Sequence, residues 1–347
     1  MSINRLLTLP AGPLLLAGDI GGTKTKLALY EPTGEGLRRV RESSYASAQY
    51  PTFDQVVADF LAETSALVSA ACFGVAGPVR AGRCRTTNLP WLLDEVELAT
   101  RTGIADVRLL NDLQAMALGL LHLPPEELVE LNPAARPDSG NKAVVAAGTG
   151  FGEAILYWDG LTHHAIATEG GHADFAPNTP EEDGLLRYLR RKFGGHVSYE
   201  RILSGPGLFN TYQYIRDNGD QMESPALVEQ LKAGGDPAQL ISRFGLEKGD
   251  PLCRESLRLF AGIFGAEAGN LALKTLAVGG VMIGGGIAPK ILPILRDGGF
   301  LSGFCNKGRF ADLLRSLSIK VALNPDAGLL GAAHHAAFSL TSIAEPQ

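Results

Sequence analysis

Two stretches of the chain share one hydropathy pattern: an apolar run, a glycine-rich turn, and a second run with the character of a strand. They lie at Leu14 to Tyr30 and at Ala143 to Tyr157. Apolar or alternating runs bounded by glycine predict a strand, a turn and a strand in each stretch. The repeated shape is typical of an internal duplication, although two unrelated β-hairpins would show it as well.

Further helices and strands are predicted to alternate along the rest of the chain. We expect strands at 71–75, 107–110 and 278–283, and helices at 53–70, 182–193, within 227–276, from Pro289 onward and at 326–340. The helix at 182–193 is expected to be capped by Thr179, with Glu182 three residues later. This mixture of elements predicts an α/β fold with mainly buried sheets.

The chain is expected to divide into two domains near residue 123. The stretches 123–140 and 213–235, which are polar and contain proline or glycine, are predicted to be loops outside the main elements. The boundary at the first of them gives a small α/β domain at 1–122 and a large α/β domain at 123–326. The C-terminal helix, within 327–347, is predicted to return to the small domain, since Gly328 and Gly331 would permit close packing.

Composition and charge narrow the class of protein. The 347 residues carry a net charge of −6, which argues against a nucleic-acid-binding surface and favours a small polar partner. The four cysteines lie far apart, without the short spacing of a structural zinc site. The apolar run Leu14 to Ala17 is too short for a signal peptide or a membrane span, so we expect a cytoplasmic enzyme with no membrane partner.

The glycine-rich turns suggest phosphate binding, but they do not fit the common nucleotide motifs. Residues 18–25 read GDIGGTKT, in which Thr23 stands where a P-loop requires glycine, and the following residues alternate as a strand rather than opening a helix. The second turn has Glu153 where a dinucleotide-binding fingerprint requires its last glycine. Free backbone N–H groups in such turns can form an anion-binding nest, although an ordinary hairpin turn explains either one alone. A third glycine cluster after a strand, at Gly284 to Gly286, favours a nucleotide held between two domains.

Eight motifs, in this order and spacing, resemble the bacterial-type ATP-dependent glucokinase family. They are DIGGTKT at 19–25, GVAGPV at 74–79, TTNLPW at 86–91, LLNDLQA at 109–115, AAGTGFG at 146–152, EGGHADFAPN at 169–178, SYERILSGPGL at 198–208 and GGGIAP at 284–289. The resemblance covers about Leu14 to Leu330. It implies two duplicated domains of the actin-like ATPase (ribonuclease H-like) fold flanking a cleft, and transfer of the γ-phosphate of ATP to the 6-hydroxyl of glucose.

The resemblance also implies roles for individual residues in sugar binding and catalysis. Asp112 is expected to be the catalytic base for the 6-hydroxyl, and Asn111 to hold the sugar. A carboxylate at the end of a strand can orient a hydroxyl towards a phosphate, although an Asn-Asp pair is also a common helix N-cap. Glu169, His172 and Glu200 are expected to bind further sugar hydroxyls, whereas without the resemblance they would be read as surface charges and a turn histidine.

The same resemblance implies where ATP and magnesium bind and that two chains associate. The phosphates are expected between Gly21, Gly22, Thr23 and Gly148, Thr149, Gly150, with the adenosine near Gly284, Gly285, Gly286 and Ile287. Asp19 would face Mg²⁺, mainly through water, because magnesium needs only one or two protein carboxylates. No zinc is expected, since the cysteine-rich loop of a related group of sugar kinases is absent after His172. A homodimer is expected by resemblance.

Two alternatives of other classes are less favoured, and a broader substrate range stays open at this point. A sugar-sensing regulator on the same scaffold would usually carry a DNA-binding helix pair before the first hairpin, and only 13 residues precede Leu14. The other alternative, a P-loop ATPase, fails because Thr23 stands in place of the required glycine and because a strand, not a helix, is predicted to follow. The sequence does not distinguish a strict glucokinase from a broader hexose kinase. It also does not distinguish ATP from polyphosphate as the phosphoryl donor.

Overall fold

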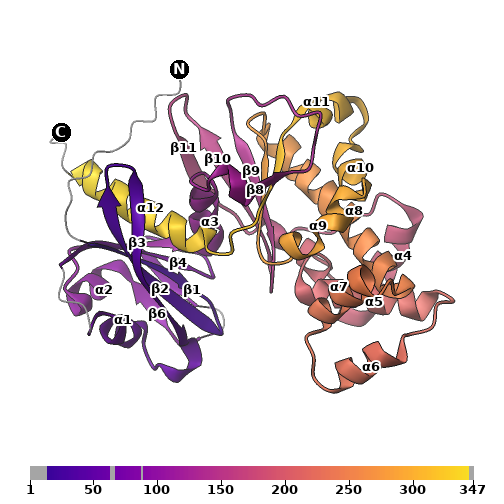
Figure 1. The fold of residues 1–347 in the computed structure, drawn as a ribbon, viewed down its shortest axis with the longest axis horizontal. Helices are drawn as coiled ribbons and strands as arrows, with labels where there is room; N and C mark the ends of the chain where they lie inside the picture. The colour runs from indigo at the N-terminus through magenta and orange to yellow at the C-terminus, as the bar shows by residue number, and fades with distance from the viewer. Residues whose placement is uncertain (1–13, 63–66, 87–88, 344–347) are drawn as a thin grey trace. The chain divides into compact units, whose positions relative to one another are not determined.

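The computed structural model describes residues 14–62, 67–86 and 89–343, with side chains up to residue 340. The chain divides into two compact units (Figure 1). Unit 1 comprises the described residues of Met1–Leu123 and Asp326–Gln347, and unit 2 comprises Pro124–Pro325. Thr87 and Asn88 of the motif at 86–91, and the end of the predicted C-terminal helix, lie outside the described residues.

Unit 1 contains a five-stranded sheet with the order β3-β2-β1-β4-β7. Its strands are β1 (Leu14–Ile20), β2 (Lys24–Thr33), β3 (Gly36–Ala46), β4 (Val68–Val75) and β7 (Asp106–Asn111). β1 and β2 form an antiparallel hairpin, and β1, β4 and β7 are parallel. A small separate sheet pairs β5 (Arg83–Arg85) with β6 (Leu92–Asp94).

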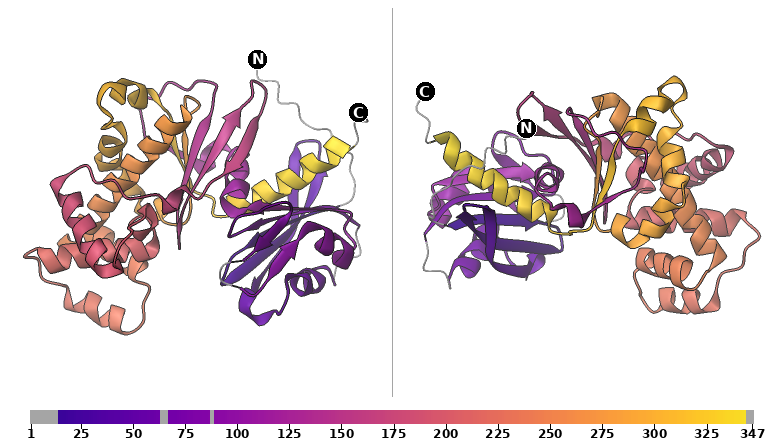
Figure 2. Two further views of the ribbon diagram at one scale, coloured as in Figure 1. Left: turned by 180° about the vertical axis from the view of Figure 1, so that it is seen from behind. Right: turned by 45° about the horizontal axis from the view of Figure 1, so that its top comes forward.

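Helices cover both faces of this sheet, which is why its central strands are apolar on both sides. Leu15 and Ala17 of β1 belong to a core with α12 (Ala327–Ile343), whereas Leu16, between them, packs in a core with α1 (Phe53–Leu61). Figure 2 shows the two helices on opposite sides of the sheet. The remaining helices of the unit are α2 (Glu95–Thr102) and α3 (Asp112–Leu120).

Unit 2 repeats the sheet order of unit 1 and adds one strand. Its order is β11-β10-β9-β12-β13-β8. The strands are β8 (Leu128–Glu130), β9 (Lys142–Ala147), β10 (Phe151–Trp158), β11 (His163–Ala167), β12 (Val281–Gly284) and β13 (Ile319–Ala322). The hairpin β9-β10 occupies the place that β1-β2 has in unit 1, and β9, β12 and β13 are parallel. This repeat confirms the predicted α/β fold class with two duplicated units.

Unit 2 is the more helical of the two units. Its helices are α4 (Pro180–Phe193), α5 (Gly205–Asn218), α6 (Pro225–Lys232), α7 (Pro237–Glu247), α8 (Pro251–Thr275), α9 (Leu292–Arg296), α10 (Gly299–Cys305) and α11 (Ala311–Ser316). The long α8, most of whose residues are buried, packs on β9 and carries much of the core. The Thr179 side chain accepts a hydrogen bond from the Glu182 N–H, as the predicted cap of α4 requires.

Several predicted limits are wrong, mostly where short apolar runs fit a helix and a strand equally well. The helix predicted at 53–70 ends at Leu61, and Val68 to Ala70 already belong to β4. The strand predicted at 278–283 begins only at Val281. Gly279 and Gly280 before it lie against neighbouring backbone, which leaves no room for side chains.

The predicted helical middle is confirmed, and the loop predicted before it is wrong. The segment 227–276 consists of three helices, α6, α7 and α8, because Pro237 and Pro251 each open a new helix after a capping aspartate. The polar stretch 213–235, predicted to be a loop, contains the end of α5 and the whole of α6. Pro289 opens a short 3₁₀ helix, Ala288–Ile291, before α9.

The contact between α12 and the end of α3 predicts an acid-sensitive stability. The His122 and His334 rings stack with centroids 3.4 Å apart. Burial, with a smaller contribution from His122, lowers the pKa of His334 to about 3. The unfolded chain therefore binds a proton at His334 that the native chain does not, so stability falls as the pH drops below about 6.5. We expect His334 to account for about 1 to 2 kcal/mol of the unfolding free energy lost between pH 7 and pH 5.

The measurement is urea unfolding of the wild type and His334→Phe at both pH values. Phenylalanine can still stack on His122 but does not titrate, so the variant should lose less stability on acidification. Equal losses in wild type and His334→Phe would contradict the assignment.

Candidate active site

The predicted site residues of unit 1 lie at the carboxyl ends of its three parallel strands. Asp19 is near the end of β1, GVAGPV begins at the end of β4, and Asn111 ends β7. In open α/β sheets this edge is where ligands bind. The topology therefore brings together residues as far apart in the sequence as Asp19 and Asn111.

The turn at Gly21 to Thr23 is a closed hairpin with free donors. The Gly21 N–H donates to Lys24 O at 3.0 Å. Ser47 fixes the turn from outside, because its N–H donates to Thr23 O at 3.1 Å and its hydroxyl donates to Gly21 O at 2.9 Å. Within the described residues, the N–H groups of Gly22 and Thr23 have no acceptor. Such a turn can bind an anion.

Asn111 and Asp112 are held at the N-terminus of α3. The Asn111 side chain caps the helix, accepting from the N–H groups of Leu113 and Gln114, and its amide donates to Gly77 O at 3.2 Å. The N-cap alternative is therefore confirmed for Asn111. Asp112 follows as the first helical residue, where the helix dipole favours a negative charge.

The GVAGPV segment shapes the backbone around Asp112. A Cβ at Gly74 would lie 3.0 Å from the Ala115 Cβ and 3.7 Å from the Asp112 Cα, so glycine allows α3 to approach the end of β4. Burial, with the charge of Asp112, raises the pKa of the nearby Cys84 thiol. Cys84 is therefore a neutral neighbour of Asp112 rather than a nucleophile.

Asp19 lies beside the first residues of α12. Burial raises the pKa of its carboxyl group despite the opposing charge of Lys26. A Cβ at Gly328 would lie 4.0 Å from the Asp19 carboxyl group. Because Lys26 does not offset the cost of burial, an additional cation at this carboxylate would stabilise its charged form. The residue thus fits the role of a magnesium-facing carboxylate.

The second turn, Gly148 to Gly150, resembles the first. The Gly148 N–H donates to Gly150 O at 2.8 Å, and among the described residues the N–H groups of Thr149 and Gly150 have no acceptor. A Cβ at Gly148 would meet nothing within 4 Å, so one side of the turn is open. Gly205, at the start of α5, donates its N–H to Gly148 O at 2.8 Å and anchors the turn.

The third glycine cluster lies next to this turn. β12 ends at Gly284, and Gly285 has a φ of +83°, which favours glycine. A Cβ at Gly285 would lie 2.3 Å from Ala147 O, the carbonyl that also accepts from the Ile287 N–H at 3.1 Å. Gly286 has open space where a Cβ would be. The structure therefore joins two glycine clusters at the carboxyl ends of β9 and β12.

Glu200, in the segment 199–201, also contacts the glycine-rich turn at Gly148 to Gly150. Its Oε2 accepts from the Phe151 N–H at 3.1 Å, and a Cβ at Gly150 would lie only 2.6 Å from that oxygen. No pattern in the sequence predicts this contact. A substitution at Gly150 would disturb Glu200, so Gly150 is not purely a nucleotide-side residue.

Glu169 and His172 lie in one turn, with exposed side chains. The His172 N–H donates to Glu169 O at 3.0 Å, and Gly170–His172 form a 3₁₀ helix. A second 3₁₀ helix, Tyr199–Arg201, carries Glu200 and is joined to the first turn by the Tyr199 N–H, which donates to Ala173 O at 3.1 Å. The three predicted sugar-binding residues of unit 2 thus lie on two adjoining turns.

Several residues that hold these side chains in place were not predicted from the sequence. Ser47, Thr168 and Ser204 fix the turns through their hydroxyl groups. Ser204 follows Glu200 by four residues and donates to its carbonyl at 2.7 Å while capping α5. The signal in the sequence was the serine before Gly-Pro-Gly, a pattern typical of a helix N-terminus.

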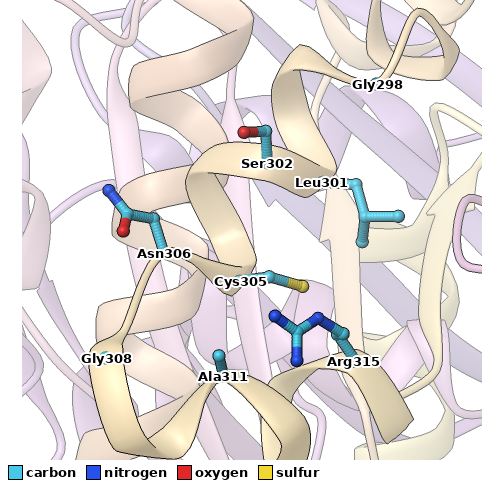
Figure 3. Close-up of a pocket in the computed structure, with 8 residues that line it drawn as sticks. All are labelled: Gly298, Leu301, Ser302, Cys305, Asn306, Gly308, Ala311 and Arg315. Carbon is cyan, nitrogen blue, oxygen red and sulfur yellow. The ribbon is translucent and has the colours of Figure 1, made fainter.

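A cavity of about 570 Å³ lies away from these residues, between α10 and α11 (Figure 3). Leu301, Cys305 and Arg315 are among the residues that line it, and it contains none of the predicted site residues. Burial raises the pKa of the Cys305 thiol, with Arg315 opposing the shift, so the thiol is not activated.

The described residues contain neither a cluster of potential metal ligands nor a membrane-spanning helix. In the ranges 14–62, 67–86 and 89–343, no three His, Cys, Asp or Glu side chains are grouped as a metal site. No helix in the described part of the chain combines the length and the apolar character needed to cross a membrane.

Comparisons with known proteins agree with each other. A family model described as "Glucokinase" matches residues 16–339. Glucokinase of Nostoc punctiforme is 41% identical over 333 residues, covering 92% of this chain and 98% of its own. Glucokinase of Yersinia pestis is 36% identical over 319 residues, covering 91% and 94%.

Solved structures show the same likeness. The crystal structure of a glucokinase from an Antarctic psychrotroph has a TM-score of 0.80 at 27% identity, covering 94% of this chain and 99% of that one. Glucokinase of Balamuthia mandrillaris, solved in complex with glucose, has a TM-score of 0.78 at 22% identity and covers 94% of both chains, which supports the fold alone.

Proposed function

The chain belongs to the glucokinase family, and we infer from this membership that it transfers the γ-phosphate of ATP to the 6-hydroxyl of glucose, giving glucose 6-phosphate and ADP. It is an ATP-dependent sugar kinase. The match of the family model over residues 16–339 carries this conclusion. The free-donor turns of β1-β2 and β9-β10 are consistent with phosphate binding.

We propose that Asp112 is the catalytic base. Its place at the N-terminus of α3, next to Asn111 at the end of β7, puts a half-buried carboxylate at the ligand-binding edge of the sheet. A hydroxyl is a weak nucleophile, and a positioned carboxylate accepts its proton as the bond to phosphorus forms. Most of the catalysis then comes from positioning and charge neutralisation.

We propose that Asn111, Asp112, Glu169, His172 and Glu200 bind the sugar hydroxyls. Carboxylates accept from hydroxyl donors, and the Asn111 amide has a second hydrogen beyond the one that Gly77 accepts. A site of this kind rejects analogues that lack a hydroxyl, because its polar groups are then left unpaired. This supports specificity for a hexose with the hydroxyl pattern of glucose.

We propose that ATP lies with its phosphates at Gly21, Gly22, Thr23, Gly148, Thr149 and Gly150 and its adenosine at Gly284, Gly285 and Gly286. Mg²⁺ would be held by Asp19, mainly through water, and when bound it neutralises charge on the phosphates. No zinc is needed for any of these roles.

We also propose that the two units are the domains of the enzyme, with limits at 1–122 with 327–347, and 123–326, and that two chains form a homodimer. Limited proteolysis tests the first proposal through cleavage near residues 123 and 326. Light scattering at micromolar concentration tests the second, since a mass near twice 36.7 kDa is expected.

The function is tested by a coupled assay with a panel of sugars and donors. We expect the highest kcat/KM with glucose and ATP, and lower values with mannose, fructose, glucosamine and polyphosphate. Equal rates with several hexoses would mean a broader hexose kinase. Sugar binding without phosphorylation would mean a sugar sensor.

A pair of variants separates the sugar site from the nucleotide site. Glu200→Gln removes a charged acceptor, and we expect the KM for glucose to rise about tenfold or more while the KM for ATP changes little. Gly148→Val adds a branched side chain on the open side of the Gly148–Gly150 turn, where a Cβ would have no neighbour within 4 Å. We expect it to raise the KM for ATP by a similar factor and to leave glucose nearly unaffected.

Steady-state kinetics with each substrate varied in turn measures both effects, and a thermal melt checks folding. Gly150→Val is unsuitable for the nucleotide arm because Gly150 contacts Glu200. If either variant weakens both substrates equally while its melting temperature is unchanged, the assignment of that residue is wrong.

A further inference from the structure

Strand β10 supports both turns that carry the proposed sugar-binding residues of unit 2. The Phe151 N–H donates to Glu200, as described above. On the other side of the same residue, a Cβ at Gly171 would lie 1.9 Å from Phe151 O, so the 170–172 turn rests directly on the strand backbone. A small change in β10 would therefore move Glu169, His172 and Glu200 together.

Glu153, two residues further along β10, holds the 170–172 turn in place. A Cβ at Gly170 would lie 2.1 Å from Glu153 Oε2, so the carboxyl group is in contact with the turn. The Thr168 hydroxyl donates to Glu153 O at 2.8 Å and accepts from the Gly170 N–H at 3.1 Å. Both the side chain and the backbone of Glu153 therefore hold the segment between Glu169 and His172.

The Glu153 carboxyl group is buried against a second carboxyl group, that of Glu267 in α8. Glu153 is 2% exposed and Glu267 is 0% exposed. The two side chains are hydrogen-bonded to each other, which requires a proton on one of the carboxyl groups. Among the described residues, no N–H or O–H group donates to Glu153 Oε1. Burial and the charge of Glu267 raise the pKa of Glu153 to about 8. At neutral pH the pair therefore shares one proton.

Glu267 extends the hydrogen-bond network to the 199–201 turn, which carries Glu200. Asn270 donates to Glu267 Oε2 at 2.8 Å and to the Tyr199 hydroxyl at 3.2 Å. Tyr199 also hydrogen-bonds to Glu267 and immediately precedes Glu200. The carboxyl pair thus contacts the turn of Glu169 and His172 through Glu153, and the turn of Glu200 through Tyr199.

The other charged groups around the pair are few. The Lys274 ammonium, also on α8, lies 3.4 Å from Glu267 Oε1. Lys307, after α10, interacts with Glu267 and with Glu182 of α4. Lys274 compensates one carboxylate directly, so ionisation of Glu153 would place a second negative charge in a buried site.

We propose that Glu153 is a positioning residue for glucose, which sets the two turns carrying Glu169, His172 and Glu200 through the buried carboxyl pair that it forms with Glu267. The inference rests on the proposed sugar site. Loss of the shared proton leaves two adjacent carboxylates that repel each other, and the turns separate. Glucose binding therefore weakens as the pH rises through about 8, while ATP binding does not.

Two substitutions at Glu153 test the hydrogen bond at pH 7. Glu153→Leu removes it, and we expect the KM for glucose to rise at least fivefold with the KM for ATP within twofold of wild type. Glu153→Gln can still donate from its amide to Glu267, and we expect it to recover most of that loss. A leucine variant with unchanged glucose KM, or equal rises for both substrates, would overturn the proposal.

The pH profile supplies a readout that a purely structural role would not change. In the wild type we expect the KM for glucose to rise at least threefold between pH 7 and pH 9, and in Glu153→Gln this rise should disappear. Glu182→Gln is the matched control, because Glu182 is also buried with a raised pKa but does not contact the turns. It should keep the wild-type profile. A persistent alkaline rise in Glu153→Gln would overturn the proposal.

Failure of the proposed sugar site gives a different result. If Glu200→Gln leaves the KM for glucose unchanged, the sugar site itself is misplaced. If Glu200→Gln raises the KM and the Glu153 variants do not, the sugar site stands and only the positioning role of Glu153 fails. Should Glu153→Leu prove unstable, Glu267→Gln tests the same pair from α8, with the same loss of alkaline dependence expected.

Discussion

Asp112→Asn is expected to lower kcat by at least about two orders of magnitude, the scale of a lost general base, while glucose binding stays within several-fold. Asparagine keeps the size of the side chain and can still accept the hydrogen bond that Asp112 Oδ1 receives from the Leu113 N–H. It cannot take the proton of the sugar hydroxyl. Stopped-flow or steady-state kinetics at saturating ATP measures the turnover, and titration calorimetry measures glucose affinity.

Asp94→Asn is a suitable control for this experiment. Asp94 also lies at the N-terminus of a helix in unit 1, where it caps α2 by accepting from the Val96 and Glu97 N–H groups. It is absent from the proposed site, so its variant should keep turnover within about twofold even if it melts earlier. Near-normal turnover of Asp112→Asn at saturating ATP would show that Asp112 is not the base.

Local chemistry in the sequence was sufficient to predict the two hairpins and the caps. The turns at Gly21 and Gly148 are bounded by strands on both sides, and their glycines mark the sites without knowledge of the fold. The Thr179 cap and the N-cap role of Asn111 likewise depend on residues only two or three positions away. Such short patterns can be predicted from sequence because the hydrogen bond that causes them joins residues within one turn of the chain.

The contacts that hold the site residues in place join segments far apart in the sequence, so they could not be predicted in the same way. Glu153 reads as one polar residue in an apolar strand, and only the position of α8 brings Glu267 beside it. The contact between Gly150 and Glu200 similarly follows from the way the start of α5 is tied to the Gly148 turn. In both cases the residues are far apart in sequence, and each alone fits an ordinary surface or turn position.

Gly331→Ala is expected to destabilise the protein by about 3 kcal/mol, at the upper end of the cost of overpacking. The helices α12 and α3 meet backbone to backbone: a Cβ at Gly331 would lie 1.8 Å from Ala115 O, and a Cβ at Gly119 would lie 1.7 Å from Ala327 O. These atoms belong to helix backbones and cannot rotate away. Alanine is the better helix former by about 1 kcal/mol, which is too little to offset the clash.

The experiment compares Gly331→Ala with Gly328→Ala in the same helix by urea unfolding. A Cβ at Gly328 would have the Asp19 carboxyl group, at 4.0 Å, as its nearest neighbour, so this variant should change stability by no more than about 1 kcal/mol. The pair therefore separates the clash from helix propensity. Because α3 begins at Asp112, residual folded Gly331→Ala should also have reduced turnover, as α12 pushes on Ala115 one turn away from the proposed base. Equal stability of the two variants would show that α12 does not pack on α3 as closely as the structure places it.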